Sequence, residues 1–274
     1  MDGITVTRHP LAGSAVVAEI ILDRPPVNSL STSLAHALIA ACAEVAAEPS
    51  VRAVVLSAAP GGKAFCAGAD LKERAAMSDA DILRQRPVFR AAFGAVLGLP
   101  QPVVAAVYGF ALGGGMELTL SCDLIVADET AVFGLPEVTV GLVPGGGGTQ
   151  LALRRLGSGR AADLVLTGRK LGIDEAERLG LVDRRVPSGM TAVASAISGA
   201  AVTEAALDLA AQIAANSPVA VRAAKQAIRH GWGAGLAAAL DIEDAAWRTA
   251  VLSADRREGI AAFAEKRPPQ WPTD

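Results

Sequence analysis

Short apolar runs alternate with segments of helical periodicity through the first half of the chain. Four of these runs are rich in β-branched residues and are bounded by polar residues, glycine or proline, as buried strands are; they cover 15–23, 51–57, 102–107 and 123–128. Such an alternation of strands and helices is typical of the α/β class, in which helices cover a largely parallel sheet.

The segments between these runs predict helices. After the first run, apolar residues recur at helical spacing, at Leu34, Leu38, Ala41 and Val45. Ser31 or Thr32 can cap the start of this helix. A second helix is expected over much of 79–98, with a kink or break at Pro87, and a third over 114–121.

The last third of the chain has a different character. Residues 188–203 are small and nearly uncharged, which predicts a linker or insertion after a core of residues 1–187. The region 204–274 is helical in pattern; Ser217 before Pro218 marks one helix start and Gly231 its end. Such a short helical region buries little core alone, so we expect it to dock on the main domain, on a neighbouring subunit or on both.

Composition narrows the classes of function. The 274 residues are 51% hydrophobic and 19% charged, and the net charge is −3. This balance is typical of a globular protein and gives no basic surface for nucleic acid, so no nucleic-acid partner is expected. An anionic ligand would depend on local positive charge and on backbone amides.

Targeting signals and membrane spans are not expected. The start of the chain lacks the basic and apolar regions of a signal peptide, and the separated Cys42, Cys66 and Cys122 predict reduced thiols in the cytoplasm. Residues 91–116 are uncharged, but prolines and glycines interrupt them, which favours a buried strand and turn over a membrane helix.

Two glycine-rich segments fail the tests for nucleotide binding. No strand precedes the GSGRAA sequence at 157–162, and no lysine follows the glycines of 141–150. The histidines are scattered singly, and no set of metal ligands is visible. Neither a metal nor a redox cofactor is therefore expected.

Two other segments can carry chemistry. In KAFCAGADLKE (63–73), Gly68 lets a backbone lie close to a ligand, while Asp70 is typical of a helix N-cap. In YGFALGGGMELTLSCD (108–123), three glycines between a strand and a helix place free N–H groups and a helix dipole at one point. Such a point favours a developing negative charge. Glu117 falls in the first turn, where an acidic residue alone is more typical of a surface position.

These segments, together with FGLPEVTVGLVPGGGGTQLALRRLG and the later LTGRKLGIDEAERLGLVDRRVP, resemble the successive signatures of the enoyl-CoA hydratase/isomerase (crotonase) family. The resemblance covers about residues 4–267 in order. It implies a crotonase-like spiral of ββα repeats with a C-terminal helical region used in trimerisation, as a homotrimer or a dimer of trimers.

The resemblance also assigns residues. It implies an oxyanion hole at the amides of Ala69 and Gly114 and two catalytic glutamates, Glu117 and Glu137. The acyl-CoA site would further include Arg24, Ala67, Gly68, Asp70, Leu71, Lys72 and Gly113. In related proteins the last helix contacts CoA bound to an adjacent subunit, which implies roles for Phe263 and Lys266. Arg24 and Lys72 are candidates for the CoA phosphates, and a solvated surface role is the alternative for each.

Because both glutamates are present, the resemblance favours an enoyl-CoA hydratase, which adds water to a 2-enoyl-CoA. Isomerases of the Δ3,Δ2-enoyl-CoA type usually work with one carboxylate, although PPVNSLS (25–31) resembles some of them. A family member that binds acyl-CoA without turnover is the other alternative. The acyl substrate and the pathway do not follow from the sequence.

Overall fold

The computed structural model describes residues 3–187 and 199–272. Its main sheet has the strand order β1-β2-β3-β5-β7-β10. The first two strands form an antiparallel hairpin, and every later pairing in this sheet is parallel. The strands are β1 (Ile4–Pro10), β2 (Val16–Leu22), β3 (Val51–Ala58), β5 (Val103–Val107), β7 (Leu124–Asp128) and β10 (Arg184–Val186).

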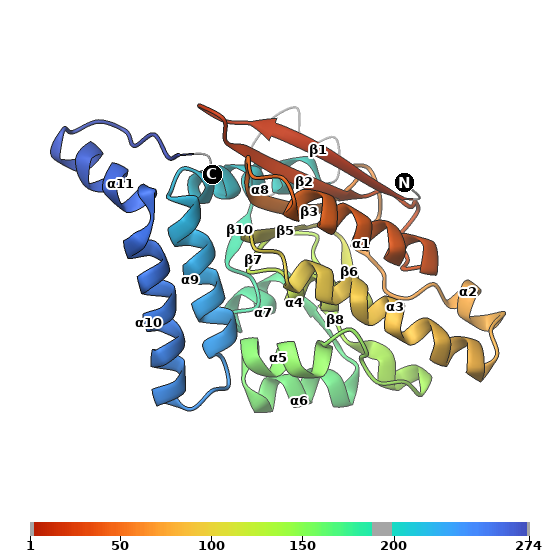
Figure 1. Ribbon diagram of the computed structural model, residues 1–274. Coiled ribbons are helices and arrows are strands. Elements are labelled where there is room, and N and C mark those ends of the chain that lie inside the picture. Colours follow the sequence, from red (N-terminus) through yellow and green to blue (C-terminus); the bar gives the residue numbers. More distant parts are fainter. Residues whose placement is uncertain (1–2, 188–198, 273–274) are drawn as a thin grey trace.

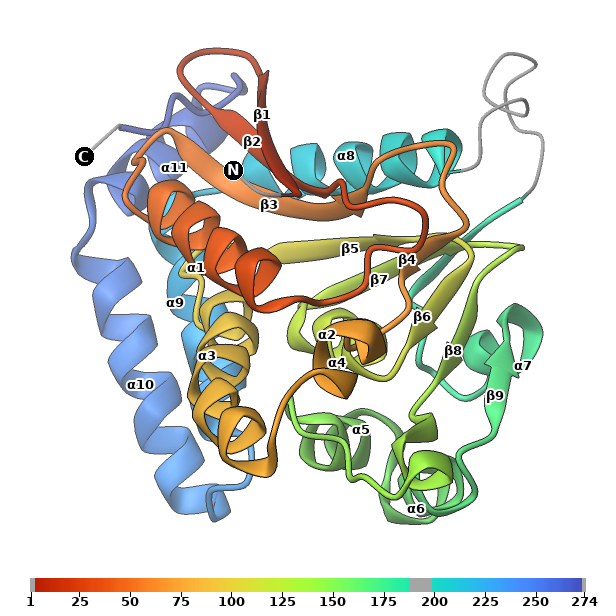
Figure 2. The same cartoon turned by 90° about the vertical axis from the view of Figure 1, so that its right-hand side faces the viewer.

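A second sheet of short strands runs beside the first, in the order β4-β6-β8-β9. Its strands are β4 (Ala64–Cys66), β6 (Phe110–Leu112), β8 (Val132–Gly134) and β9 (Lys170–Gly172). Each of β3, β5 and β7 is followed by one strand of this second sheet and then by a helical segment. The chain therefore builds successive ββα units, as the resemblance implied (Figures 1 and 2).

Helices cover both faces of the main sheet (Figure 2). On one side lie α1 (Thr32–Ala46), α3 (Asp79–Leu97) and α4 (Gly114–Ser121), and on the other lies α8 (Ala200–Ala214). Every residue of β3 and β5 is consequently buried, which explains why these strands are apolar throughout and do not alternate. The side chain of Ser31 caps α1, and the four apolar positions that predicted this helix are buried.

The remaining helices lie around this core. They are α2 (Leu71–Ala75), the 3₁₀ helix η1 (Pro136–Val140), α5 (Gly148–Leu156), α6 (Ser158–Thr167) and α7 (Ile173–Arg178). The helix predicted over 79–98 is α3, and Pro87 does not break it. Pro87 is exposed, so the carbonyl that loses its backbone partner there can be solvated.

The predicted linker needs one correction. Gly199 is the N-cap of α8, which begins at Ala200, so residues 200–203 are helical; residues 188–198 of the prediction lie outside the described residues. The small residues of this stretch predicted a linker, but alanine, which is common in linkers, is also the best helix former. Since α8 packs on β3, β5 and β7, it belongs to the core.

The last helices form a separate layer at one side of the molecule (Figure 1). They are α9 (Pro218–Gly231), α10 (Leu236–Leu252) and α11 (Ala254–Ala264). Asp123 anchors α9 to the core through ion pairs of 2.8 Å to Lys225 and 2.7 Å to Arg229. Helix α10 packs on α9, yet none of its residues is buried in the single chain.

All three cysteines are free and buried, and burial raises the pKa of each thiol. Within 3–187 and 199–272, no helix combines the length and apolar character needed to cross a membrane.

Candidate active site

Two backbone segments meet at the ends of β4 and β6. Gly68 has a φ of +93°, and a Cβ placed on it would lie 2.8 Å from the carbonyl oxygen of Leu112. The same Cβ would lie 3.4 Å from the backbone nitrogen of Gly114. Glycine is therefore required for the two backbones to approach so closely.

This approach brings the predicted oxyanion donors together. Among the hydrogen bonds of the described residues, none uses the amide of Ala69 or of Gly114 as donor. Gly114 is also the first residue of α4, so its N–H adds to the positive end of that helix. Two free N–H groups beside a cavity can stabilise negative charge on a carbonyl oxygen.

Glu117 lies in the first turn of α4 but is only 3% exposed, so the interpretation as a surface residue is wrong. Its Oε1 accepts hydrogen bonds from the amides of Gly146, at 2.6 Å, and Gly148, at 2.8 Å. Burial raises the pKa of the Glu117 carboxyl, against the opposing effect of these donors and of the Arg86 charge. The carboxyl is thus fixed in position by backbone groups.

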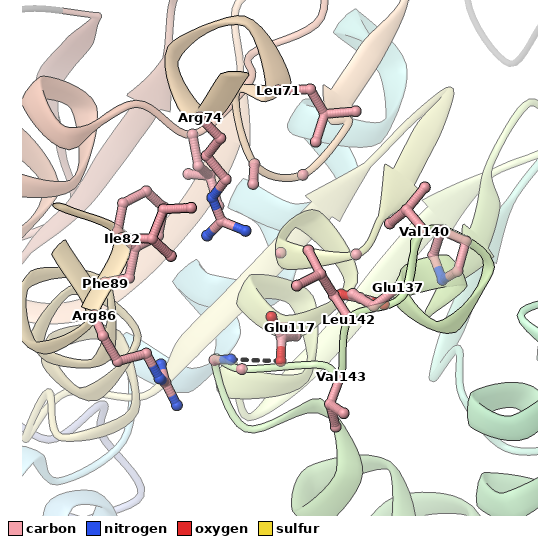
Figure 3. Close-up of a pocket in the computed structure, with 18 of the residues that line it drawn as sticks. Leu71, Arg74, Ile82, Arg86, Phe89, Glu117, Glu137, Val140, Leu142 and Val143 are labelled. Atoms are coloured by element: carbon pink, nitrogen blue, oxygen red, sulfur yellow. Dashed lines mark hydrogen bonds between the residues drawn. The ribbon is translucent and has the colours of Figure 1, made fainter. Parts of the chain in front are cut away.

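Glu137, on η1, faces the same cavity (Figure 3). A Cβ on Gly113 would lie 3.1 Å from its Oε1, and its Oε2 is buried without a hydrogen-bond partner among the described residues. Burial raises the pKa of Glu137 to about 7, and the nearby charge of Glu117 adds to the rise, whereas its own backbone amide and Arg74 oppose it. This carboxyl can therefore hold a proton near neutral pH.

The cavity has a volume of about 300 Å³. Of the predicted site residues, eight line it: Ala67, Gly68, Ala69, Leu71, Gly113, Gly114, Glu117 and Glu137. Apolar side chains from α3, η1 and the segment after η1 form most of the remaining wall, including Ile82, Phe89, Val140, Leu142 and Val143 (Figure 3).

Five predicted residues lie outside this lining: Arg24, Asp70, Lys72, Phe263 and Lys266. The guanidinium of Arg24 donates to Asp70 at 2.7 Å and to Ser29, while Asp70 caps α2 as expected. Lys72 is exposed on α2. Arg24 and Asp70 thus fix the segment that carries Ala69, and the roles predicted for these two residues and Lys72 toward CoA stay predictions.

Phe263 lies in the last turn of α11 and Lys266 follows this helix, which lies on the opposite side of the molecule from α2 (Figure 1). Phe263 is 88% exposed, as a side chain that contacts another subunit would be before assembly. Their predicted contact with CoA on an adjacent subunit stays a prediction.

Several residues of the site are not evident from the sequence. The amides of Gly146 and Gly148, which hold Glu117, come from the glycine-rich segment that failed as a phosphate loop. A Cβ on Gly146 would lie 2.4 Å from Phe93, so tight packing explains this glycine. Arg74 also lines the cavity, and it stands in no sequence motif that could have revealed it.

Comparison with known proteins places the chain in a family. The model of the enoyl-CoA hydratase/isomerase family matches residues 12–274. The chain belongs to this family. It is 41% identical over 256 residues to human enoyl-CoA hydratase domain-containing protein 2, mitochondrial, covering 93% of this chain and 85% of that protein.

Two further relatives agree. Human methylglutaconyl-CoA hydratase, mitochondrial, is 40% identical over 245 residues, which are 89% of this chain and 70% of that protein. The crystal structure of an enoyl-CoA hydratase from Bacillus anthracis matches with a TM-score of 0.89 and 40% identity, over 99% of this chain and 100% of that one. The resemblance and the crotonase-like fold are therefore confirmed.

Proposed function

We propose that the protein is an enoyl-CoA hydratase, which adds water reversibly to a 2-enoyl-CoA to give a 3-hydroxyacyl-CoA. The observation that carries the proposal is that two carboxyl groups, Glu117 and Glu137, face one cavity beside two free amides. Hydration needs a polarised thioester, an activated water and a proton for the α-carbon, and this set of groups can supply all three.

In the proposed mechanism, the amides of Ala69 and Gly114 bind the thioester oxygen and stabilise the enolate. Glu117 holds a water and takes one of its protons while the water oxygen bonds to the β-carbon. Glu137 donates its proton to the α-carbon as the enolate collapses. The proton on Glu117 must then return to Glu137 before the next cycle.

The environments of the two carboxyls support this division. Burial raises the pKa of Glu117, but two backbone N–H groups donate to its carboxyl and oppose this rise, which favours the ionised form that acts as a base. Glu137 has a buried oxygen without a partner among the described residues and a pKa near 7, which favours a group that carries a proton. Because the charges interact, the measured titrations will belong to the pair.

We further propose that no metal or redox cofactor takes part, and that Arg24 and Lys72 meet the CoA phosphates. Phe263 and Lys266 would contact CoA on an adjacent subunit of a homotrimer or dimer of trimers. The exposed apolar residues of α10, such as Leu236, Leu240 and Trp247, support such an assembly.

The test is hydration of crotonyl-CoA by the wild type and by Glu117→Gln and Glu137→Gln, followed by loss of the enoyl-thioester absorbance. Each substitution should lower the rate by about 10²–10⁴, and the double variant should lose much less than the product of the two, because the groups act together. Loss in only one single variant would contradict the two-carboxylate mechanism.

The same samples separate the alternatives. An isomerase would shift the double bond of a 3-enoyl-CoA faster than it hydrates a 2-enoyl-CoA, with one glutamate nearly dispensable. A protein that only binds acyl-CoA would hydrate no 2-enoyl-CoA, whatever its chain length.

A further inference from the structure

Two arginines line the cavity without a carboxylate partner. Arg74 lies on α2 and Arg86 on α3. In the described part of the chain, no side chain or carbonyl forms a hydrogen bond or ion pair with either guanidinium. Neighbouring arginines behave differently: Arg24 pairs with Asp70, and Arg84 pairs with Asp81. The two cavity arginines are therefore available to a ligand.

Arg74 is the more enclosed of the two. Its Nε is buried and lacks a hydrogen-bond partner among the described residues, and its guanidinium lies over the ring of Phe89, 5.5 Å from the centroid. Its charge lowers the pKa of Glu137, which places it close to the proposed acid. In Figure 3 its guanidinium points into the cavity toward Glu117. The Nε is too enclosed to meet a ligand, but the terminal N–H groups of Arg74 also have no partner among the described residues and can donate to an anionic acceptor in the cavity.

Arg86 occupies another part of the wall. Its guanidinium lies 3.4–3.7 Å from the point that a Cβ on Gly145 would occupy. Gly145 precedes Gly146, whose amide donates to Glu117, and the charge of Arg86 lowers the pKa of Glu117. Arg86 is exposed, so a ligand that covers it would remove the water that screens its charge.

The balance of charge in the cavity indicates what such a ligand is. The guanidiniums stay protonated at all ordinary pH values. The proposed hydration requires one of the two glutamates to carry a proton, so the cavity then holds one more positive than negative charge. A neutral acyl group would leave this charge uncompensated. The volume of about 300 Å³ is at the low end for ligand pockets, which favours a short acyl group.

We propose that the preferred substrate is a short 2-enoyl-CoA whose acyl chain ends in a carboxylate, which Arg74 and Arg86 bind. This inference rests on the proposed hydratase function for its chemistry, and it adds the substrate class. Arg74, being more enclosed, makes the larger contribution.

Two matched pairs of ligands test the proposal. The first pair is the five-carbon 2-enoyl-CoA that ends in a carboxylate and its methyl-ended counterpart, compared by kcat/KM for hydration. The second pair is the corresponding saturated acyl-CoAs, compared by Kd in calorimetry. The variants are Arg74→Gln and Arg86→Gln, with Arg84→Gln as the control on α3, because Arg84 lies outside the cavity lining.

We expect the wild type to favour the carboxylate-ended member of each pair by about 10- to 100-fold, in kcat/KM for the enoyl-CoAs and in Kd for the saturated acyl-CoAs. This is the size of effect that hydrogen bonds to a charged group produce. Arg74→Gln should remove most of this ratio, Arg86→Gln should reduce it, and Arg84→Gln should leave it unchanged. A wild-type ratio of one or less, or a ratio that survives both cavity substitutions, would overturn the proposal.

The matched pairs also distinguish binding of the acyl carboxylate from binding of the CoA phosphates. Both members of each pair carry the same CoA phosphates. If the arginines bind those phosphates, their substitution should weaken binding and lower kcat/KM equally for both members, and this result would count against the proposal. If the saturated pair shows the expected ratio but neither enoyl-CoA is hydrated, the substrate class stands and the hydratase function fails. If both enoyl-CoAs are hydrated with equal kcat/KM, the hydratase function stands and the substrate class fails.

Discussion

Replacing Glu137 by glutamine should make the folded protein more stable at neutral pH, although it lowers the rate of the proposed hydration. The physical reason lies in the surroundings of the carboxyl. Its Oε2 is buried without a hydrogen-bond partner among the described residues, and burial raises its pKa from 4.5 to about 7. Ionising this group is therefore easier in the unfolded chain than in the folded protein.

The raised pKa fixes the sign of the effect. The folded state holds the Glu137 proton more tightly than the unfolded chain does. The free energy of unfolding is therefore highest below the pKa of Glu137 in the unfolded chain, and it falls as pH rises through the pKa of Glu137 in the folded protein. A shift from 4.5 to about 7 corresponds to about 3 kcal/mol. This is an upper value, because Glu137 is only partly buried. Glutamine cannot ionise, so the Glu137→Gln protein should not show this fall in the free energy of unfolding.

The assay is urea unfolding of the wild type and Glu137→Gln at several values between about pH 4.5 and 8, the window set by the two pKa values. The difference in unfolding free energy between the two proteins should grow in favour of the variant across that window. Glu204→Gln, at an exposed position of α8, is the control and should follow the wild type. A Glu137→Gln protein that loses as much stability as the wild type with rising pH would refute the reasoning.

Four further results are expected. The kcat/KM for hydration should fall as pH rises through about 7, because Glu137 must be protonated to act as the acid; a flat profile well into the alkaline range would contradict this role. Asp123→Asn should lower the free energy of unfolding in urea by about 3 kcal/mol, since it leaves the cations of Lys225 and Arg229 without their partner, and a negligible change would show that other contacts hold α9. Leu240→Glu, on the exposed face of α10, should reduce the assembled mass in sedimentation, and an intact trimer or hexamer would place the interface elsewhere. A chelator should leave hydration unchanged, whereas loss that zinc restores would reveal a metal.

The sequence predicted those parts of the fold that local patterns decide. The apolar runs around Val51 and Val103 became buried strands, and the spacing from Leu34 to Val45 gave α1 with its Ser31 cap. These elements were predictable because burial on both faces makes a strand apolar throughout, and burial of one helix face imposes a helical period.

Features set by contacts between distant segments were not predictable in this way. Glu117 looked like a surface residue, because its burial depends on donors about 30 residues later, at Gly146 and Gly148. Arg74 stands in a short charged helix, and only the approach of α3 and η1 turns it toward a cavity. The start of α8 at Ala200 was missed, since alanine carries no signal that separates a helix from a linker.

The segment from Pro136 to Gly148 sets both carboxyl positions at once. Glu137 stands near its beginning, and the amides that hold Glu117 stand at its end. Chain length within this segment is therefore as constrained as residue identity: inserting or deleting a single residue between these points would shift one carboxyl relative to the other. Engineering of the apolar wall at Val140, Leu142 and Val143 should accordingly proceed by substitution at fixed length.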